Sequence, residues 1–411
     1  MRYSPVLAAV LVLGCLPRLV SGAGVVETPL KDLGSVPPRS ALAASLESIL
    51  VCSPDGTRLA RVASEPRTRK WRVVCDGKQG PPVDDVANPS LAFTPDGKRL
   101  IYAARTGPDR VVMVDDKVIR NALSYAISPD GKRMAYVLDA GNSNYALMMN
   151  DTKLTTRSHE ISCLTFSPDS RRFAYIIQTE EIARGYIWLR DMITVDGKGG
   201  RVAYADMRAV TFSPDSRHWA AAAQEKGGKD KDRWRVVMDD KELPVCDEVG
   251  DPVFAPAGLH LAYPARSATG WFMIRDSRSG PKFDRVGLPT FSPDATHLVY
   301  SAQRGASTVV VCDDRTTGDY SAVDWITFSP DGKHIAWSAS RGDDSVVVCD
   351  GVEGPPHSEV VIPRQATDLP GKLRYVAVDK VTGKEERKAV LVEVDWPADR
   401  TWEDAFKAEK K

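Results

Sequence analysis

The segment Phe93-Thr94-Pro95-Asp96-Gly97-Lys98-Arg99-Leu100-Ile101-Tyr102 decides the fold, because its pattern returns along most of the chain. The five-residue phrase that opens it has eight further copies, some degenerate, which begin at Cys52, Ile127, Phe166, Phe212, Phe254, Phe291, Phe328 and, in eroded form, near Asp368. Successive copies are 34 to 46 residues apart. A repeat of about 40 to 45 residues is typical of one four-stranded propeller blade.

Each repeat contains the signals of four short strands. In the phrase, Pro presets the backbone for a tight turn, Asp tolerates the next position, and Gly follows. Apolar β-forming runs flank this turn, and a third run such as Val346-Val347-Val348-Cys349 leads into an Asp-Gly hairpin signal and a weaker fourth run. The sequence therefore predicts an all-β fold, a closed β-propeller of four-stranded antiparallel blades, in which ring closure removes exposed sheet edges.

The number of blades is less firmly specified than the architecture. Nine repeats can be traced in the 411 residues, whereas propellers typically have about four to eight blades. The last repeat has a poor turn and no clear fourth strand after Val390-Leu391-Val392-Glu393-Val394. We expect about eight blades, in a range of seven to nine, with an N-terminal strand near Val25-Val26-Glu27 available to close the ring.

The repeated phrase resembles the WD40-like, TolB-like β-propeller repeat of bacterial envelope proteins. The resemblance covers roughly residues 45 to 395 and is clearest at Phe93 to Tyr102 and Phe328 to Trp337. It implies a propeller, and it does not fix a function. TolB carries an additional N-terminal domain, but repeats here begin by residue 53. Related peptidases carry a hydrolase domain with Gly-x-Ser-x-Gly, a string that this sequence lacks.

Composition and the chain ends indicate which partners and which location the sequence favours. The 55 basic and 55 acidic residues balance, which argues against a broad nucleic-acid-binding surface. Residues 1–22 have the pattern of an export signal, and the alternative is lipid attachment at Cys15; no segment has the length of a transmembrane helix. We therefore expect a signal peptide at 1–22, a lead-in at 23–45, the propeller at 46–396, a short charged helix at 397–411, and a periplasmic or extracellular location.

Six cysteines remain after residue 22: Cys52, Cys75, Cys163, Cys246, Cys312 and Cys349. An even number in an exported protein suggests disulfides. However, three of these cysteines occupy one equivalent repeat position, and equivalent positions on packed sheets are about 10 Å apart, too far for a disulfide. We expect mostly buried free thiols.

Basic residues recur at one repeat position, two residues after the Pro-Asp turn. The position is occupied in eight successive repeats by Arg58, Arg99, Arg133, Arg172, His218, His260, His297 and His334. Four histidines suggest a metal site, but equivalent positions on successive blades form an arc and do not converge on one ion. The favoured interpretation is a polar residue that opens the second strand, and the alternative is a basic arc that binds an anionic partner.

Aromatic residues recur at a second position, five residues before the turn that ends the third strand: Trp71, Tyr145, Trp234 and Trp271. Packing between blades is the favoured interpretation, because aromatic rings bury large areas. The alternative is an aromatic rim for protein or glycan contact.

The sequence contains none of the motifs that we associate with catalysis, a cofactor or a metal. It therefore favours an exported, non-catalytic platform that binds another envelope or extracellular protein through its loops. Two alternatives stay open: a small-ligand or carbohydrate binder, and an enzyme whose site lies at the central channel. Many functions share this fold.

Overall fold

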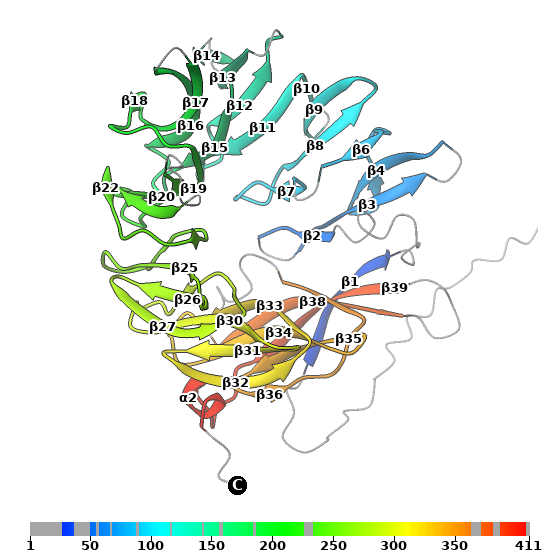
Figure 1. Cartoon of the computed structure of the whole chain (residues 1–411). Coiled ribbons are helices and arrows are strands. Elements are labelled where there is room, and N and C mark those ends of the chain that lie inside the picture. The colour runs from blue at the N-terminus through cyan, green and yellow to red at the C-terminus, as the bar shows by residue number, and fades with distance from the viewer. Residues whose placement is uncertain are drawn as a thin grey trace, which may run out of the picture.

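The computed structural model describes residues 27–36, 50–54, 57–65, 68–87, 90–115, 117–141, 144–155, 159–183, 186–225, 233–362, 371–380 and 387–407. These residues form nine antiparallel sheets that follow one another around a ring (Figure 1). The predicted β-propeller is confirmed, with nine blades, the upper end of the expected range. The predicted signal segment and Cys15 lie outside the described residues.

Blades 1 to 5 follow each other in chain order. Blade 1 contains β2 (Leu50–Cys52), β3 (Leu59–Glu65), β4 (Lys70–Cys75) and β5 (Lys78–Gln79). Blade 2 contains β6 (Asp85–Val86), β7 (Ala92–Phe93), β8 (Leu100–Thr106), β9 (Asp109–Val114) and β10 (Lys117–Arg120). Blade 3 contains β11 (Ala122–Ile127), β12 (Met134–Asp139), β13 (Tyr145–Met149) and β14 (Thr152–Thr155). Blade 4 contains β15 (Ile161–Phe166), β16 (Phe173–Ala183), β17 (Tyr186–Val195) and β18 (Lys198–Gly199). Blade 5 contains β19 (Asp206–Phe212), β20 (Trp219–Gln224), β21 (Trp234–Met238) and β22 (Lys241–Glu242).

The remaining four blades complete the ring. Blade 6 contains β23 (Glu248–Val249), β24 (Val253–Phe254), β25 (Leu261–Ser267), β26 (Gly270–Arg275) and β27 (Arg278–Phe283). Blade 7 contains β28 (Arg285–Val286), β29 (Thr290–Phe291), β30 (Leu298–Arg304), β31 (Ser307–Cys312) and β32 (Arg315–Tyr320). Blade 8 contains β33 (Ala322–Phe328), β34 (Ile335–Arg341), β35 (Asp344–Cys349) and β36 (Val352–Glu353). Blade 9 contains β37 (Glu359–Val361), β38 (Lys372–Lys380), β39 (Arg387–Asp395) and β1 (Glu27–Val36), and α2 (Trp402–Ala405) follows.

The Pro-Asp turn between the first and second strands is held by its own side chains. In blade 3 the Ser128 hydroxyl donates to Asp130 Oδ1 at 2.6 Å, and the Arg133 amide donates back to Ser128 Oγ at 2.9 Å. Gly131 follows at a φ of 69°, in the left-handed region that favours glycine. The same hydroxyl–carboxylate bond recurs at Thr94, Ser167, Ser213, Ser292 and Ser329. We call the side of the ring that carries these turns the Pro-Asp face.

The turn between the third and fourth strands lies on this same face. Asp196 begins that turn in blade 4 with a φ of 52°, and its Oδ1 accepts the Phe173 amide at 2.9 Å. This bond ties the turn to the first residue of the second strand. Equivalent bonds are made by Asp76, Asp115, Asn150, Asp239, Asp276, Asp313 and Asp350.

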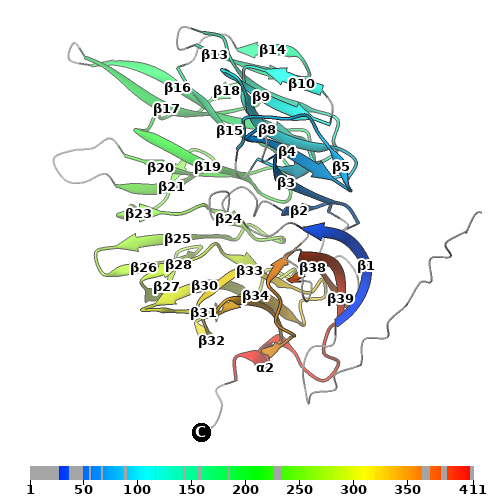
Figure 2. The same cartoon turned by 90° about the vertical axis from the view of Figure 1, so that its right-hand side faces the viewer.

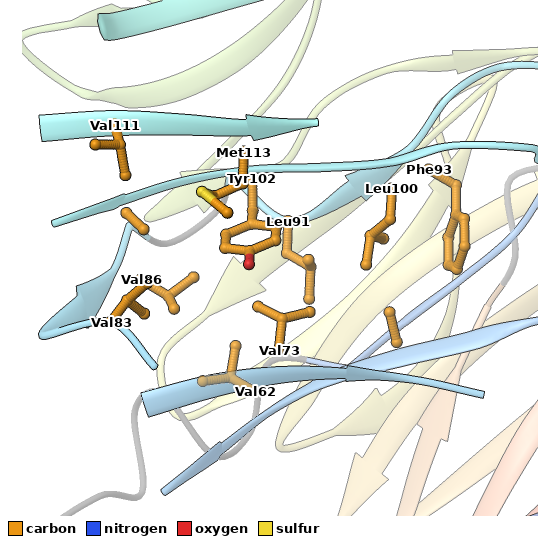
Figure 3. Packing of buried hydrophobic residues seen from close by; sticks show 12 residues of the cluster. Val62, Val73, Val83, Val86, Leu91, Phe93, Leu100, Tyr102, Val111 and Met113 are labelled. Atoms are coloured by element: carbon orange, nitrogen blue, oxygen red, sulfur yellow. The ribbon is translucent and has the colours of Figure 1, made fainter. Parts of the chain in front are cut away.

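The hydrophobic core lies between blades. Figure 3 shows Val62 and Val73 of blade 1 facing Leu100, Tyr102 and other apolar side chains of blade 2. Each buried cluster among the described residues combines side chains of two adjacent blades, so each sheet depends on its neighbours to exclude water from its faces.

Strand β1 closes the ring from the other end of the chain. It pairs antiparallel with β39 from Glu27↔Val394 to Val36↔Arg387. Blade 9 also packs on blade 1, where Leu59 joins Val376 and Val378 in one buried cluster. The described residues include no helix that is long and apolar enough to cross a bilayer.

Candidate functional site

Two of the arginines predicted to form an arc, Arg58 and Arg172, bond to turn aspartates of their own blades. Arg172 Nε donates to Asp196 Oδ2 at 2.9 Å, and Arg58 Nε donates to Asp76 Oδ2 at 2.8 Å. Hydrogen bonding to Asp76 is the main reason why the pKa of Arg58 is raised. The turn carboxylate thus uses one oxygen for the backbone and the other for the basic side chain.

The arginines also join neighbouring blades. The Arg172 guanidinium donates to the carbonyls of Ser216 and Arg217 in blade 5 and lies 5.2 Å from the centre of the Phe212 ring. Equivalent bonds to a carbonyl of the next blade are made by Arg58, Arg99 and Arg133. This geometry describes a repeated clamp between blades, with part of each guanidinium open to solvent.

The four histidines replace this clamp in blades 5 to 8. His260 Nδ1 is 2.9 Å from Asp276 Oδ2, and His334 Nδ1 is 2.7 Å from Asp350 Oδ2. His218 and His297 are each 2.5 Å from their turn aspartates. Each histidine thus binds its own aspartate, and no group of three or more His, Cys, Asp or Glu side chains in the described chain is arranged to hold a metal ion.

The C-terminal segment covers two of these histidines. The Trp402 ring centre lies 4.4 Å from that of His297, and the Trp396 ring stacks on His334 at 5.5 Å. Trp402 and Phe406 are buried in the cluster between blades 7 and 8. This segment therefore leaves less of the predicted basic arc open to a partner.

The four predicted aromatic residues do not form one rim. Trp234 is buried, with the Arg208 guanidinium 4.2 Å from its ring centre, and Trp271 lies beside Arg266 at 5.8 Å. Trp71 is half-buried and packs against the core between blades 1 and 2. Tyr145 lines a groove.

That groove consists of two adjoining cavities over blades 2 to 4. Their volumes are about 290 and 420 Å³, and Arg110, Leu123 and Tyr145 line both. Arg110 and Tyr145 occupy the same repeat position in consecutive blades. The groove combines an aromatic ring with opposite charges, since Asp139 lines the smaller cavity and Glu160 the larger.

A long hairpin in blade 4 is a feature that the sequence did not predict as a site. Strands β16 and β17 have 11 and 10 residues, whereas the second and third strands of blades 1 to 3 and 5 to 8 have five to seven. Figure 2 shows the hairpin at the upper left, extending from the ring. The signal was present in the sequence, because the longest step between repeats, 46 residues, spans this hairpin.

Three of the eight large apolar side chains that are exposed among the described residues lie in this hairpin. Ile182 is 75% exposed, Trp188 49% and Leu189 45%. The register pairs Glu180 with Leu189 and Ile182 with Ile187, so Ile182 and Leu189 share one face. On the other face, Arg190 bonds to Glu181 at 3.0 Å and lies 5.4 Å from the Trp188 ring centre.

A buried polar cluster joins β1 to the rest of blade 9. His357 is 7% exposed; its Nδ1 lies 2.7 Å from Asp379 Oδ2 and its Nε2 2.9 Å from Glu27 Oε1. The Tyr375 hydroxyl donates to the same Glu27 carboxylate. Burial alone would lower the pKa of His357, but the bonds to Asp379 and Glu27 outweigh it and raise the pKa to about 9. This cluster binds the closing strand, and no repeat position in the sequence indicates it.

The five cysteines whose side chains are described are free, as predicted: Cys75, Cys163, Cys246, Cys312 and Cys349. The expectation that most of them are buried is wrong, because only Cys312 and Cys349 are buried and the other three are half-buried. Burial raises the pKa of Cys75 to about 11, and it raises the pKa of Cys312 and Cys349 as well. Thiols held in the protonated form are poor nucleophiles and poor metal ligands.

Comparisons with known proteins agree with the fold. No family model matches the sequence, and no curated protein matches it. The crystal structure of a eukaryotic initiation factor is similar, with a TM-score of 0.51 and 11% identity over 75% of this chain and 85% of that one. TolB from Acinetobacter baumannii is also matched, with a TM-score of 0.32 and 16% identity over 63% of this chain and 62% of that one. The propeller domain of a trilobed protease from Pyrococcus furiosus is matched with a TM-score of 0.38 and 12% identity over 66% of this chain and 97% of that one. At 11% identity, the likeness to the initiation factor shows the fold alone.

Proposed function

We propose that this protein is an exported, non-catalytic β-propeller that acts as a protein-interaction platform in the cell envelope or outside the cell. The observation that carries the proposal is the β16–β17 hairpin. It presents Ile182, Trp188 and Leu189 to solvent, although side chains of this size normally contribute to a core or an interface. The ring supplies a rigid base for the hairpin, which suits a surface that docks a partner.

The partner that fits this hairpin is a protein with an apolar groove. The Ile182–Leu189 face supplies apolar contact area, while Arg190 and Glu181 hold the Trp188 side of the hairpin in one arrangement. Tryptophan side chains that are ordered before binding are frequent energetic centres of interfaces. Residues 1–22 would direct export, and their removal would leave β1 intact from Glu27.

The proposal is tested by cross-linked pull-down of the tagged protein from its native envelope fraction, followed by mass spectrometry. The double variant Ile182→Asp/Leu189→Asp is expected to reduce recovery of the wild-type partner at least tenfold, because charges replace the apolar contact. Leu154→Asp is the matched control, since Leu154 is 51% exposed on the fourth strand of blade 3. Equal recovery by the double variant would contradict the proposal.

The same experiment addresses the alternative of a small-ligand or carbohydrate binder. The groove at Tyr145 is the observation that favours this alternative, because its aromatic ring lies beside planar polar groups such as Arg110 and Asn121. If Tyr145→Ala loses the partner and the hairpin variant retains it, the partner binds at the groove and not at the hairpin.

A further inference from the structure

A separate cavity lies between blades 6 and 7, at the outer part of the Pro-Asp face. Its volume is about 390 Å³, and its lining includes Met273, Arg278 and Gly280 of blade 6 and Leu298, Tyr300 and Asp314 of blade 7. The β16–β17 turn lies at the opposite ends of the strands, so this cavity is on the other side of the ring from the hairpin. A ligand here would not compete with the proposed partner.

The cavity contains a buried hydroxyl that has no partner. Tyr300 is 2% exposed, and its hydroxyl makes no hydrogen bond with any described residue. A buried polar group without a partner is costly, so such a group requires an explanation. Burial, followed by the nearby Asp314 carboxylate, raises the pKa of Tyr300, which keeps the hydroxyl protonated.

Blade 3 contains the same pair of residues in a closed arrangement. Tyr136 occupies the repeat position of Tyr300, and its hydroxyl donates to Asp151 Oδ1 at 2.6 Å. Asp151 and Asp314 are both the second residue of the turn after the third strand, with φ values of 65° and 70°. In blade 7 the hydroxyl and the carboxylate do not bond, and both line the cavity.

Gly280 lies directly against both groups. A Cβ atom on Gly280 would lie 3.3 Å from the Tyr300 hydroxyl oxygen, 3.3 Å from Asp314 Oδ1 and 3.5 Å from the Met273 carbonyl oxygen. Two of these contacts are tight for a Cβ atom, so a larger residue at position 280 would crowd the hydroxyl and the carboxylate at this edge of the cavity. The structure records no hydrogen bond or ion pair for the Asp314 carboxylate among the described residues.

We infer that this cavity binds a ligand through a primary ammonium group. An ammonium has N–H donors and one positive charge, which match an unbonded hydroxyl oxygen and a carboxylate that line the same cavity. The side chains of Met273 and Leu298 offer apolar surface to an alkyl stem. Arg275 does not fill the site, because its guanidinium is bonded to the carbonyls of Ala295 and Thr296.

The ammonium group can belong to a free alkylamine or to a lysine side chain of another protein. Titration calorimetry with n-butylammonium and with the peptide acetyl-Ala-Lys-Ala-amide separates these sources, with 1-pentanol as the uncharged control. We expect saturable binding of butylammonium and none of pentanol. Tighter binding of the peptide assigns the site to a lysine side chain, and tighter binding of the free amine assigns it to a small molecule.

Three variants test the geometry. Tyr300→Phe and Asp314→Asn are each expected to weaken butylammonium binding about tenfold, the size expected for a lost bond to a charged group. Gly280→Ala is also expected to weaken butylammonium binding, because its methyl group would crowd the Tyr300 hydroxyl and the Asp314 carboxylate. Tyr136→Phe and Asp151→Asn are the matched controls and should bind like the wild type.

The inference is overturned if the wild-type protein does not bind butylammonium up to millimolar concentrations. It is also overturned if pentanol binds equally well, or if Tyr300→Phe and Asp314→Asn bind butylammonium unchanged. These results do not depend on the hairpin, so failure here leaves the proposed interaction platform untouched.

Discussion

At the scale of single residues, the clamp between blades predicts unequal roles for residues at one repeat position. Arg172 bonds to Asp196 of its own blade and to two carbonyls of blade 5, whereas Arg99 is exposed and makes one recorded bond, to the Gly131 carbonyl. We expect Arg172→Ala to lower the free energy of unfolding by about 2 kcal/mol, and Arg99→Ala by less than about 1 kcal/mol. Urea unfolding followed by tryptophan fluorescence measures both. Equal losses would show that the bonds to blade 5 do not contribute.

The residue scale also shows what the sequence can specify. The repeat places Arg172 and His260 at equivalent positions, and it predicts their polar role at the start of the second strand. It does not show that Asp196 or Asp276 accepts them, because that depends on how the turn after the third strand folds back. Tyr300 and Tyr136 are equivalent in sequence, yet the Tyr136 hydroxyl bonds to Asp151 and the Tyr300 hydroxyl has no partner among the described residues.

At the scale of elements, strand β1 is held by a titratable cluster. The pKa of His357 is raised to about 9 in the folded protein, above the ordinary value of 6.5. Protonation is therefore favoured by folding, so the stabilisation is fully present below about pH 6.5 and is lost as the pH rises through 9. Between pH 6.5 and 9.5, we expect the free energy of unfolding of the wild type to fall by on the order of 2 kcal/mol relative to that of His357→Gln. Urea unfolding of both proteins across this range measures the difference.

The control for this prediction is His159→Gln, which removes a more exposed histidine that pairs with Glu180 on the long hairpin. The dependence of its stability on pH is the reference for a histidine outside the buried cluster. If the free energies of unfolding of the wild type and His357→Gln differ by the same amount at all pH values, protonation of His357 does not contribute to stability. Sequence alone does not predict the cluster, because Glu27 and His357 are 330 positions apart and meet only in the closed ring.

At the scale of the whole molecule, the repeat predicted the architecture because each blade depends on the same local turns and the same apolar alternation. The blade number was harder to predict, since the ninth blade is built from both chain ends and lacks a clear Pro-Asp phrase. The hairpin and the ammonium cavity arise where a repeat departs from its pattern, through extra residues in blade 4 and an open Tyr–Asp pair in blade 7. Function in such a ring is therefore expected at its irregular blades.

Ring closure by β1 leads to a prediction for the intact molecule. A chain that begins at Leu50 lacks β1, which leaves β39 as an unpaired edge and blade 9 with three strands. Because an open edge strand pairs readily with other chains, we expect this protein to lose at least about 3 kcal/mol of stability and to self-associate. Light scattering during size-exclusion chromatography measures the association.

Adding a peptide of residues 27–36 should restore the monomer. A peptide with Glu27→Ala should do so less well, because it lacks the carboxylate that binds His357 and Tyr375. A stable monomer without β1 would mean that eight blades and a three-stranded ninth are sufficient to close the ring.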